Sequence, residues 1–144
     1  MDIRKIDDSI SVAPQITPED VAELARLGFR TLVANRPDRE EPGQPAMADI
    51  QRAAEENGLK WVFLPVESGN IQDSDVDAFA PMFKEAEKPM LAFCRSGTRC
   101  TVLWALSSAR HMPLEPIIQR AGQAGYDIRG LVPRLQQQAS SHQD

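Results

Sequence analysis

The residues of this sequence best suited to chemistry lie in one short loop. The loop is Cys94-Arg95-Ser96-Gly97-Thr98-Arg99. It follows an apolar run, Met90–Phe93, typical of a strand buried on both faces, and it precedes an apolar stretch typical of a helix. Backbone N–H groups of a tight loop before a helix point to one place, and the helix dipole adds partial positive charge there. The pattern therefore predicts an anion-binding loop.

Cys94 is the predicted nucleophile. Close to arginine at a helix N-terminus, the pKa of a thiol falls from about 8.5 to about 3.5–7.5, so Cys94 should be mostly thiolate at neutral pH without a histidine base. We expect Arg99 to clamp the bound anion with two hydrogen bonds and Arg95 to make an outer electrostatic contact. The alternative is a buried thiol at a strand end, since free cysteine is among the most buried residue types.

The positions of the second cysteine and of the two histidines limit which groups could act together with Cys94 or bind a metal. Cys100 falls inside the apolar helix, where packing is the favoured interpretation and a resolving cysteine the weaker one. His111 would lie about 17 Å along that helix from the loop, and His142 is near the C-terminus, so neither is expected to serve Cys94 as a base. No CxxC or HExxH spacing is present, and we expect neither a metal nor a cofactor.

Strands and helices alternate along the chain. Strands are predicted over 9–12, 29–34, 60–65 and 90–93, and helices over 17–27, 45–57, 73–88, 99–110, 114–124 and 129–138. This alternation predicts an α/β fold, a single domain with a central, mainly parallel sheet flanked by helices. Because loops that follow parallel strands meet at one edge of a sheet, the Asn35–Glu40 and Glu67–Asn70 loops should join the Cys94 loop.

Composition limits the classes of function. The 144 residues suit one domain, predicted over 1–138 with a flexible tail over 139–144. A net charge of −5 and a pI near 5.1 disfavour nucleic acid and anionic membrane surfaces as partners. The longest apolar run, Trp61–Val66, is far shorter than the ~20 residues of a membrane span, and the N-terminus lacks the pattern of a signal peptide. We therefore expect a cytoplasmic protein.

Four segments together resemble a known family. The Cys94 loop is similar to the active-site loop of rhodanese-type sulfurtransferases and, in a longer form, of cysteine-dependent phosphatases. With Asn35-Arg36-Pro37-Asp38, Leu64-Pro65-Val66 and Gly125-Tyr126-Asp127-Ile128, nearly the whole chain resembles the bacterial beta-lactamase-hydrolase-like, phosphatase-like domain family. The resemblance implies a dual-specificity-phosphatase fold. It also implies a stand-alone protein or a fusion to a persulfide dioxygenase of the metallo-beta-lactamase type, and hence a partner enzyme of that type.

The spacing of the arginine favours sulfur over phosphorus. In the phosphatase pattern the arginine stands six residues after the nucleophile, whereas here that position is Cys100 and Arg99 comes one residue earlier. A persulfide sulfur is a single small anion, while a phosphoryl group has three equatorial oxygens to be held. The shorter loop is therefore expected to suit sulfur better.

The second difference from the phosphatase pattern is that no aspartate stands where the general acid is expected. The loop at the corresponding place offers Glu67 and no aspartate before Asp73, and Asp38 on another loop is a further candidate. Sulfur transfer needs no such acid, and both carboxylates are otherwise ordinary solvated loop acids. The family resemblance alone suggests that Asn35 and Arg36 orient the rim of the site or a substrate anion.

The leading hypothesis is a rhodanese-like sulfurtransferase. Cys94 would attack the outer sulfur of a small anionic donor, thiosulfate or a persulfide, and pass the sulfur from a Cys94 persulfide to an acceptor. The alternative is a phosphatase of the dual-specificity or tyrosine-phosphatase type that forms a Cys94 phosphocysteine. A second alternative is a non-catalytic anion-binding module.

Overall fold

A five-stranded sheet runs through the middle of the molecule, in the order β1-β2-β5-β3-β4. The computed structural model describes residues 1–141. The strands are β1 (Arg4–Lys5), β2 (Ile10–Ala13), β3 (Thr31–Ala34), β4 (Lys60–Phe63) and β5 (Met90–Phe93). Only the two-residue β1 is antiparallel to its neighbour; the other four strands are parallel.

The register of the parallel strands aligns their carboxyl ends. Phe93, the last residue of β5, pairs with Ala13 of β2 and with Ala34 of β3, and Ala34 in turn pairs with Phe63 of β4. The segments that follow these four strands therefore leave the sheet side by side, and one of them begins with Cys94.

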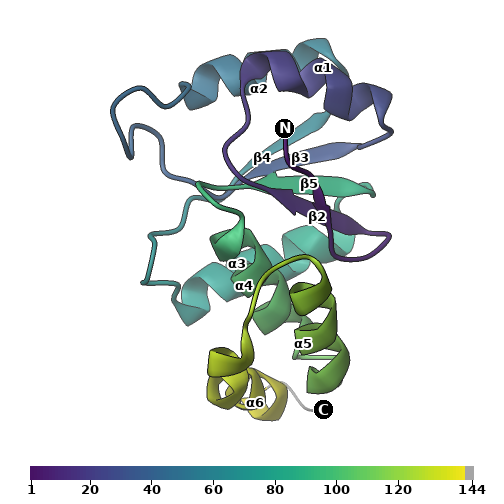
Figure 1. The fold of residues 1–144 in the computed structure, drawn as a ribbon, viewed down its shortest axis with the longest axis vertical. Coiled ribbons are helices and arrows are strands. Elements are labelled where there is room, and N and C mark those ends of the chain that lie inside the picture. Colours follow the sequence, from purple (N-terminus) through teal and green to yellow (C-terminus); the bar gives the residue numbers. More distant parts are fainter. Residues whose placement is uncertain (142–144) are drawn as a thin grey trace.

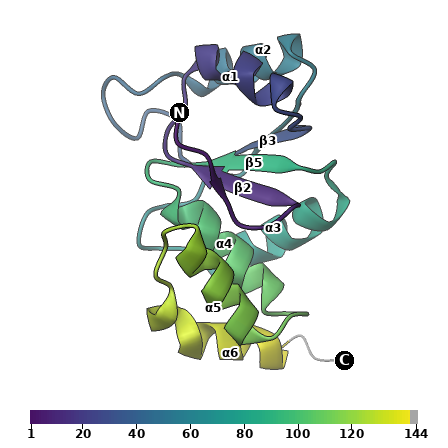
Figure 2. The same ribbon diagram turned by 45° about the vertical axis from the view of Figure 1, so that its right-hand side comes forward.

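Helices cover both faces of this sheet (Figures 1 and 2). One face carries α1 (Pro18–Arg26) and α2 (Met47–Glu56). The other carries α3 (Asp73–Glu85), α4 (Thr98–Ser108), α5 (Leu114–Gln123), the short 3₁₀ helix η1 (Arg129–Leu131) and α6 (Val132–Ser141). The predicted α/β class, with a mainly parallel sheet between layers of helices, is confirmed.

Alternate side chains of β5 supply the two halves of the core. Leu91 and Phe93 pack with the helices α1 and α2, while Met90 and Ala92 pack with the helices of the other layer. All four are fully buried, as expected for a central strand with helices on both faces. The loop after β5 is therefore anchored at a rigid point.

Most predicted elements are present with ends that differ by one to three residues, and three further details matter here. The strand β1 was not predicted, since two residues are too few to show a periodic pattern. The helix α4 begins at Thr98, inside the Cys94 loop, and α6 continues to Ser141 rather than ending near 138. The tail predicted over 139–144 thus begins inside α6. Its last three residues, of which His142 is the first, lie outside the described residues. Over residues 1–141, every helix is too short or too polar to cross a membrane.

Candidate active site

The Cys94 loop bends back on the sulfur of Cys94. Gly97 precedes the first residue of α4 and has a left-handed backbone, with φ 90°. Its N–H donates a hydrogen bond to the Cys94 Sγ at 3.1 Å. On the other side of Gly97, its carbonyl accepts from the Thr101 hydroxyl at 2.9 Å, which ties the loop to the first turn of α4. Glycine is favoured here because other residues rarely adopt this conformation.

The surroundings of Cys94 stabilise its ionised form. A hydrogen bond from the Cys100 thiol and backbone N–H groups of the loop lower the pKa of Cys94 from 9.0 to about 5, against the opposing effect of burial. Burial and the neighbouring Cys94 sulfur raise the pKa of Cys100 well above its ordinary value. Cys94 is therefore the thiolate of the pair at neutral pH and Cys100 the thiol that donates to it.

Arg99 is a buried arginine held by the loop that follows β3. Its Nη1 and Nη2 donate to the two carboxylate oxygens of Glu40 at 2.7 and 2.8 Å, and Nη1 also donates to the Val66 carbonyl at 2.9 Å. The side chain is only 7% exposed. The two Nη groups that were expected to clamp a bound anion instead bind the carboxylate of Glu40. The Nε–H of Arg99 has no hydrogen-bond partner within residues 1–141, so it remains a donor for an incoming anion.

Glu40 links two buried arginines. Arg36 donates from Nε to the same carboxylate at 2.9 Å and from Nη1 to Gln15 at 3.0 Å. The hydrogen bonds from Arg99 and Arg36 lower the pKa of Glu40 to about 2. One carboxylate thus stays ionised and fixes both guanidinium groups at the edge of the sheet.

Arg95 occupies a different environment from Arg99. Its side chain is 68% exposed and pairs with Glu41 at 2.8 Å. This agrees with an outer position on the loop.

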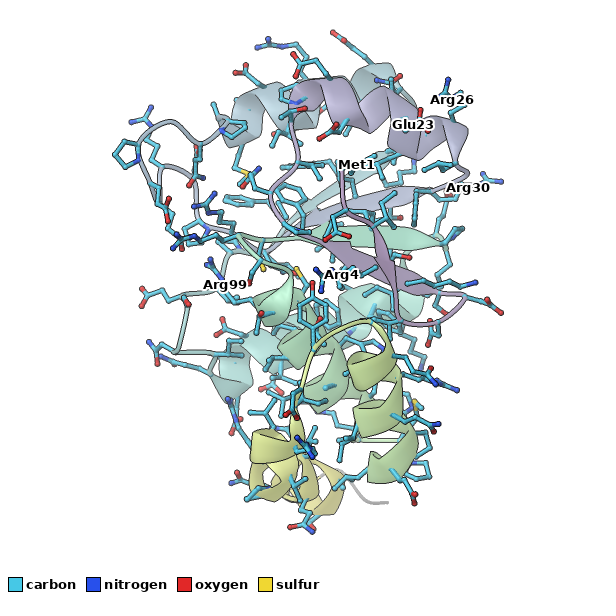
Figure 3. The ribbon with its side chains drawn as sticks, viewed as in Figure 1. Met1, Arg4, Glu23, Arg26, Arg30 and Arg99 are labelled. Atoms are coloured by element: carbon cyan, nitrogen blue, oxygen red, sulfur yellow. The ribbon has the colours of Figure 1, made fainter. Side chains whose placement is uncertain are left out.

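Tyr126 supports the Cys94 loop from the segment between α5 and η1. Its hydroxyl donates to the Ser96 carbonyl at 2.8 Å. A side chain at Gly97 would overlap the Tyr126 hydroxyl, so the tyrosine also accounts for the small residue at that position. The guanidinium of Arg4, which is labelled in Figure 3, lies over the Tyr126 ring, 5.2 Å from its centre.

A pocket of about 640 Å³ opens beside the loop. It is lined by Arg95, Ser96, Thr98 and Arg99 of the loop and the start of α4, by Ser68, Gly69, Asn70 and Ile71 after β4, and by Val102, Leu131 and Arg134. Cys94 is fully buried and does not line this pocket.

The remaining predicted site residues lie at the same edge of the sheet in different roles. Asn35 is fully buried and donates from Nδ2 to the Leu64 carbonyl, which joins the ends of β3 and β4. Asp38 is exposed and accepts from the Met47 N–H at the start of α2. Glu67 is exposed next to the pocket wall and contacts Asn70 at 3.5 Å.

Sequence reasoning missed three residues of this arrangement, Glu40, Tyr126 and Arg134. Glu40 was visible only as one charge in a polar loop. Tyr126 was visible as part of the Gly125-Tyr126-Asp127 segment, but nothing in the sequence gave it a partner. No group of three or more His, Cys, Asp or Glu side chains within residues 1–141 could hold a metal ion.

Comparison with known proteins identifies the family. The model of the family described as "Beta-lactamase hydrolase-like protein, phosphatase-like domain" matches residues 2–111, more than half of the chain. The chain belongs to this family. Two beta-lactamase hydrolase-like proteins match it, one from Agrobacterium fabrum with 36% identity over 81% of the chain and one from Xylella fastidiosa with 33% identity over 96%. The chain spans only 26% and 33% of the lengths of these relatives.

Solved structures show the same fold. A candidate phosphatase from Neisseria meningitidis is 40% identical, with a TM-score of 0.83, and the match covers 96% of this chain and 99% of that one. The core catalytic domain of a PP-IP phosphatase from S. cerevisiae, in complex with citrate, has a TM-score of 0.68 at 17% identity, covering 100% and 86%. TpbA from P. aeruginosa, in complex with pTyr, has a TM-score of 0.66 at 15% identity, covering 98% and 90%. The last two show likeness of fold alone.

These findings correct the leading hypothesis. The prediction of a rhodanese-like sulfurtransferase is wrong, because the family and the 40% identical structure are phosphatase-like. The spacing argument failed because an arginine one residue nearer to Cys94 still places a buried guanidinium beside the loop. Among these proteins, the rhodanese resemblance, the sulfur donor and the persulfide-dioxygenase-type partner find no support.

Proposed function

We propose that this protein hydrolyses phosphate monoesters through a phosphocysteine on Cys94. The observation that carries the proposal is the hydrogen bond of 3.1 Å from the Gly97 N–H to the Cys94 sulfur, in the loop that also supplies the buried Arg99. The same surroundings lower the pKa of Cys94 to about 5. A thiolate is the nucleophilic form of cysteine, and backbone donors with an arginine are the groups that hold a transferring phosphoryl group. The phosphatase-like family supports the same reaction.

The reaction has two steps. The Cys94 thiolate attacks phosphorus, an S–P bond forms, the P–O bond to the leaving group breaks, and the leaving oxygen takes a proton. Water then attacks phosphorus, the S–P bond breaks, and inorganic phosphate and the Cys94 thiolate are released. Arg99, through its Nε–H, and the backbone N–H groups of the loop stabilise the equatorial oxygens in both steps.

Glu67 is the better placed of the two predicted acids. Asp38 is directed to the N-terminus of α2, where it accepts from a backbone N–H. Glu67 directly precedes the four residues Ser68–Ile71 that line the pocket, and it follows Val66, whose carbonyl accepts from Arg99. We therefore assign to Glu67 the protonation of the leaving group.

The decisive experiment compares wild type with Cys94→Ser on an aryl phosphate and on thiosulfate. Wild type should release phosphate, carry one phosphoryl group on Cys94 after acid quenching, and transfer no sulfur, while Cys94→Ser should be inactive. Cys100→Ser is the matched control, because it removes the other cysteine and should still be phosphorylated on Cys94. Phosphate release that persists in Cys94→Ser would refute the proposal. Phosphate binding without any turnover would instead favour the non-catalytic anion-binding module.

The location of the protein in the cytoplasm stays a prediction.

A further inference from the structure

The pocket beside the Cys94 loop has a second cationic wall. Arg134 of α6 lines it together with Leu131 of η1, while Arg99 and Arg95 belong to the loop side. Leu131 and Arg134 lie beyond residues 2–111, the part matched by the family model. The reaction proposed for Cys94 does not use this wall.

Arg134 is the most weakly paired of the three arginines in the pocket. Arg99 makes two short hydrogen bonds to Glu40, and Arg95 contacts Glu41 at 2.8 Å. Among the described residues, the one ion pair of Arg134 is from Nη2 to Asp73 at 3.3 Å, and the Asp73 side chain is 61% exposed. Such a solvated pair contributes little, so the charge of Arg134 is poorly compensated.

The Arg134 side chain also has donors to spare. Its Nε and Nη1 groups make no hydrogen bond within the described part of the chain. Gln138 donates to the same Asp73 oxygen at 3.0 Å, so this carboxylate keeps a partner when Arg134 turns away. Arg134 is only 30% exposed, which holds it at the wall rather than in bulk water.

The surface between the two charged ends is mixed. Ile71, Val102 and Leu131 are apolar and partly buried, and short polar side chains lie among them. A single phosphoryl group does not fill about 640 Å³, since pockets of this size hold organic molecules. The pocket therefore fits a substrate with an apolar middle and a negative charge at each end.

We infer that Arg134 binds a second anionic group, a phosphate or a carboxylate, of the phosphate monoester whose phosphoryl group lies at Arg99 and Cys94. The inference rests on the proposed phosphatase function for its reacting end. The substrates would be phosphate monoesters that carry a second anionic group besides the phosphate, and Arg134 would be the residue that selects them.

Two matched substrates test this inference, 4-carboxyphenyl phosphate and its methyl ester. They differ at the far end by one charge, and comparing variants cancels their difference in leaving-group reactivity. In Arg134→Gln, kcat/KM for the carboxylate should fall about tenfold, as expected for one charge-assisted hydrogen bond, with the methyl ester changed less than about twofold. Arg134→Lys should recover part of the loss, and Asp73→Asn should increase the preference for the carboxylate.

Arg129→Gln is the control, because Arg129 lies five positions before Arg134 in the neighbouring helix η1, is 79% exposed and does not line the pocket. It should leave both substrates unchanged. Equal losses on both substrates in Arg134→Gln, or no loss on either, would overturn the inference.

A binding measurement separates this inference from the proposed function. Calorimetry with (4-carboxyphenyl)phosphonate and its methyl ester needs no turnover. If wild type hydrolyses neither ester but Arg134→Gln loses affinity for the carboxylate alone, the phosphatase proposal fails and the subsite stands. In the opposite case, wild type hydrolyses both aryl phosphates, and Arg134→Gln changes hydrolysis and phosphonate binding equally for the carboxylate and the methyl ester. The subsite then fails and the phosphatase proposal stands.

Discussion

The hydroxyl of Tyr126 donates a hydrogen bond to the carbonyl oxygen of Ser96, with 2.8 Å between the two oxygens. This contact joins residues 30 positions apart in the chain and holds the loop that carries Cys94. Ser96 is followed by Gly97, whose N–H donates to the Cys94 sulfur. Tyr126 therefore positions the loop without touching the sulfur itself.

Tyr126→Phe should weaken the stabilisation of the Cys94 thiolate. The change removes one partly buried hydrogen bond, which costs about 1 kcal/mol of folding stability, and it frees the Ser96 carbonyl to move. We expect a higher pKa of Cys94, measured by the ultraviolet absorbance of the thiolate against pH, and a several-fold lower kcat. Asp127→Asn, a change at the exposed neighbouring residue, should alter neither. An unchanged Cys94 pKa in Tyr126→Phe would show that the tyrosine has only a structural role.

Gly97→Ala should destabilise the protein for two separable reasons. A left-handed backbone costs a non-glycine residue about 1–2 kcal/mol, and the new methyl group would overlap the Tyr126 hydroxyl. In the double variant with Tyr126→Phe, the overlap with the hydroxyl is removed, while a tight contact of 3.0 Å to the ring carbon and the backbone cost remain. Thermal unfolding should therefore show the double variant to be more stable than the sum of the single changes predicts. Strict additivity would contradict this account of the overlap.

Glu40→Gln should lower activity by releasing Arg99. Loss of the charge-assisted hydrogen bonds from Arg99 to this carboxylate, typically about 1.5–3 kcal/mol, corresponds to roughly 10–100-fold in kcat/KM for an aryl phosphate. Glu41→Gln is the matched control, since Glu41 pairs with the exposed Arg95 at 2.8 Å and only at 3.5 Å with Arg36, and does not contact Arg99. This variant should change kcat/KM by less than about threefold. Similar losses in both variants would argue for general electrostatics of the loop.

Ionisation of Cys94 should have its midpoint near pH 5 and should depend on Cys100. The folded pKa, about 5, is below the ordinary 9.0, so the stabilising effect is complete above pH 9 and is lost as pH falls towards 5. Wild type should accordingly gain stability relative to Cys94→Ser as the pH rises through this window. Cys100→Ala should raise the midpoint, while Cys100→Ser, which keeps a donor, should change it less. A midpoint near 9 in wild type would disprove the thiolate assignment.

Glu67→Gln should affect poor leaving groups most. A phenolate with a low pKa departs without a proton, whereas an alkoxide needs one. We expect little change in kcat with a nitrophenyl ester and a loss of about 10²-fold or more with an alkyl phosphate. Asp38→Asn should show no such dependence on the leaving group, because its carboxylate faces the N-terminus of α2. Equal effects of Glu67→Gln on both esters would exclude it as the acid.

The sheet and the position of the nucleophile could be predicted because their signals are local. Three apolar strand runs, the alternating strand over 9–12 and the glycine loop after Met90–Phe93 are short patterns, and parallel pairing then brings the loops together. The partner of Arg99 could not be predicted, since Glu40 lies 59 positions away in a loop of ordinary charged residues. The sulfurtransferase prediction failed because it depended on where the guanidinium lies in space, which the spacing of Cys94 and Arg99 does not define.

Two adjacent positions of α6 have opposite surroundings, one in the core and one at the pocket. Leu135 is fully buried in the core, whereas Arg134 next to it faces the pocket. Evolution can therefore exchange the residue at 134 at little cost to folding, while the nucleophile and its loop stay the same. With the subsite inferred above, a substitution at position 134 of α6 is expected to change which monoesters the pocket accepts.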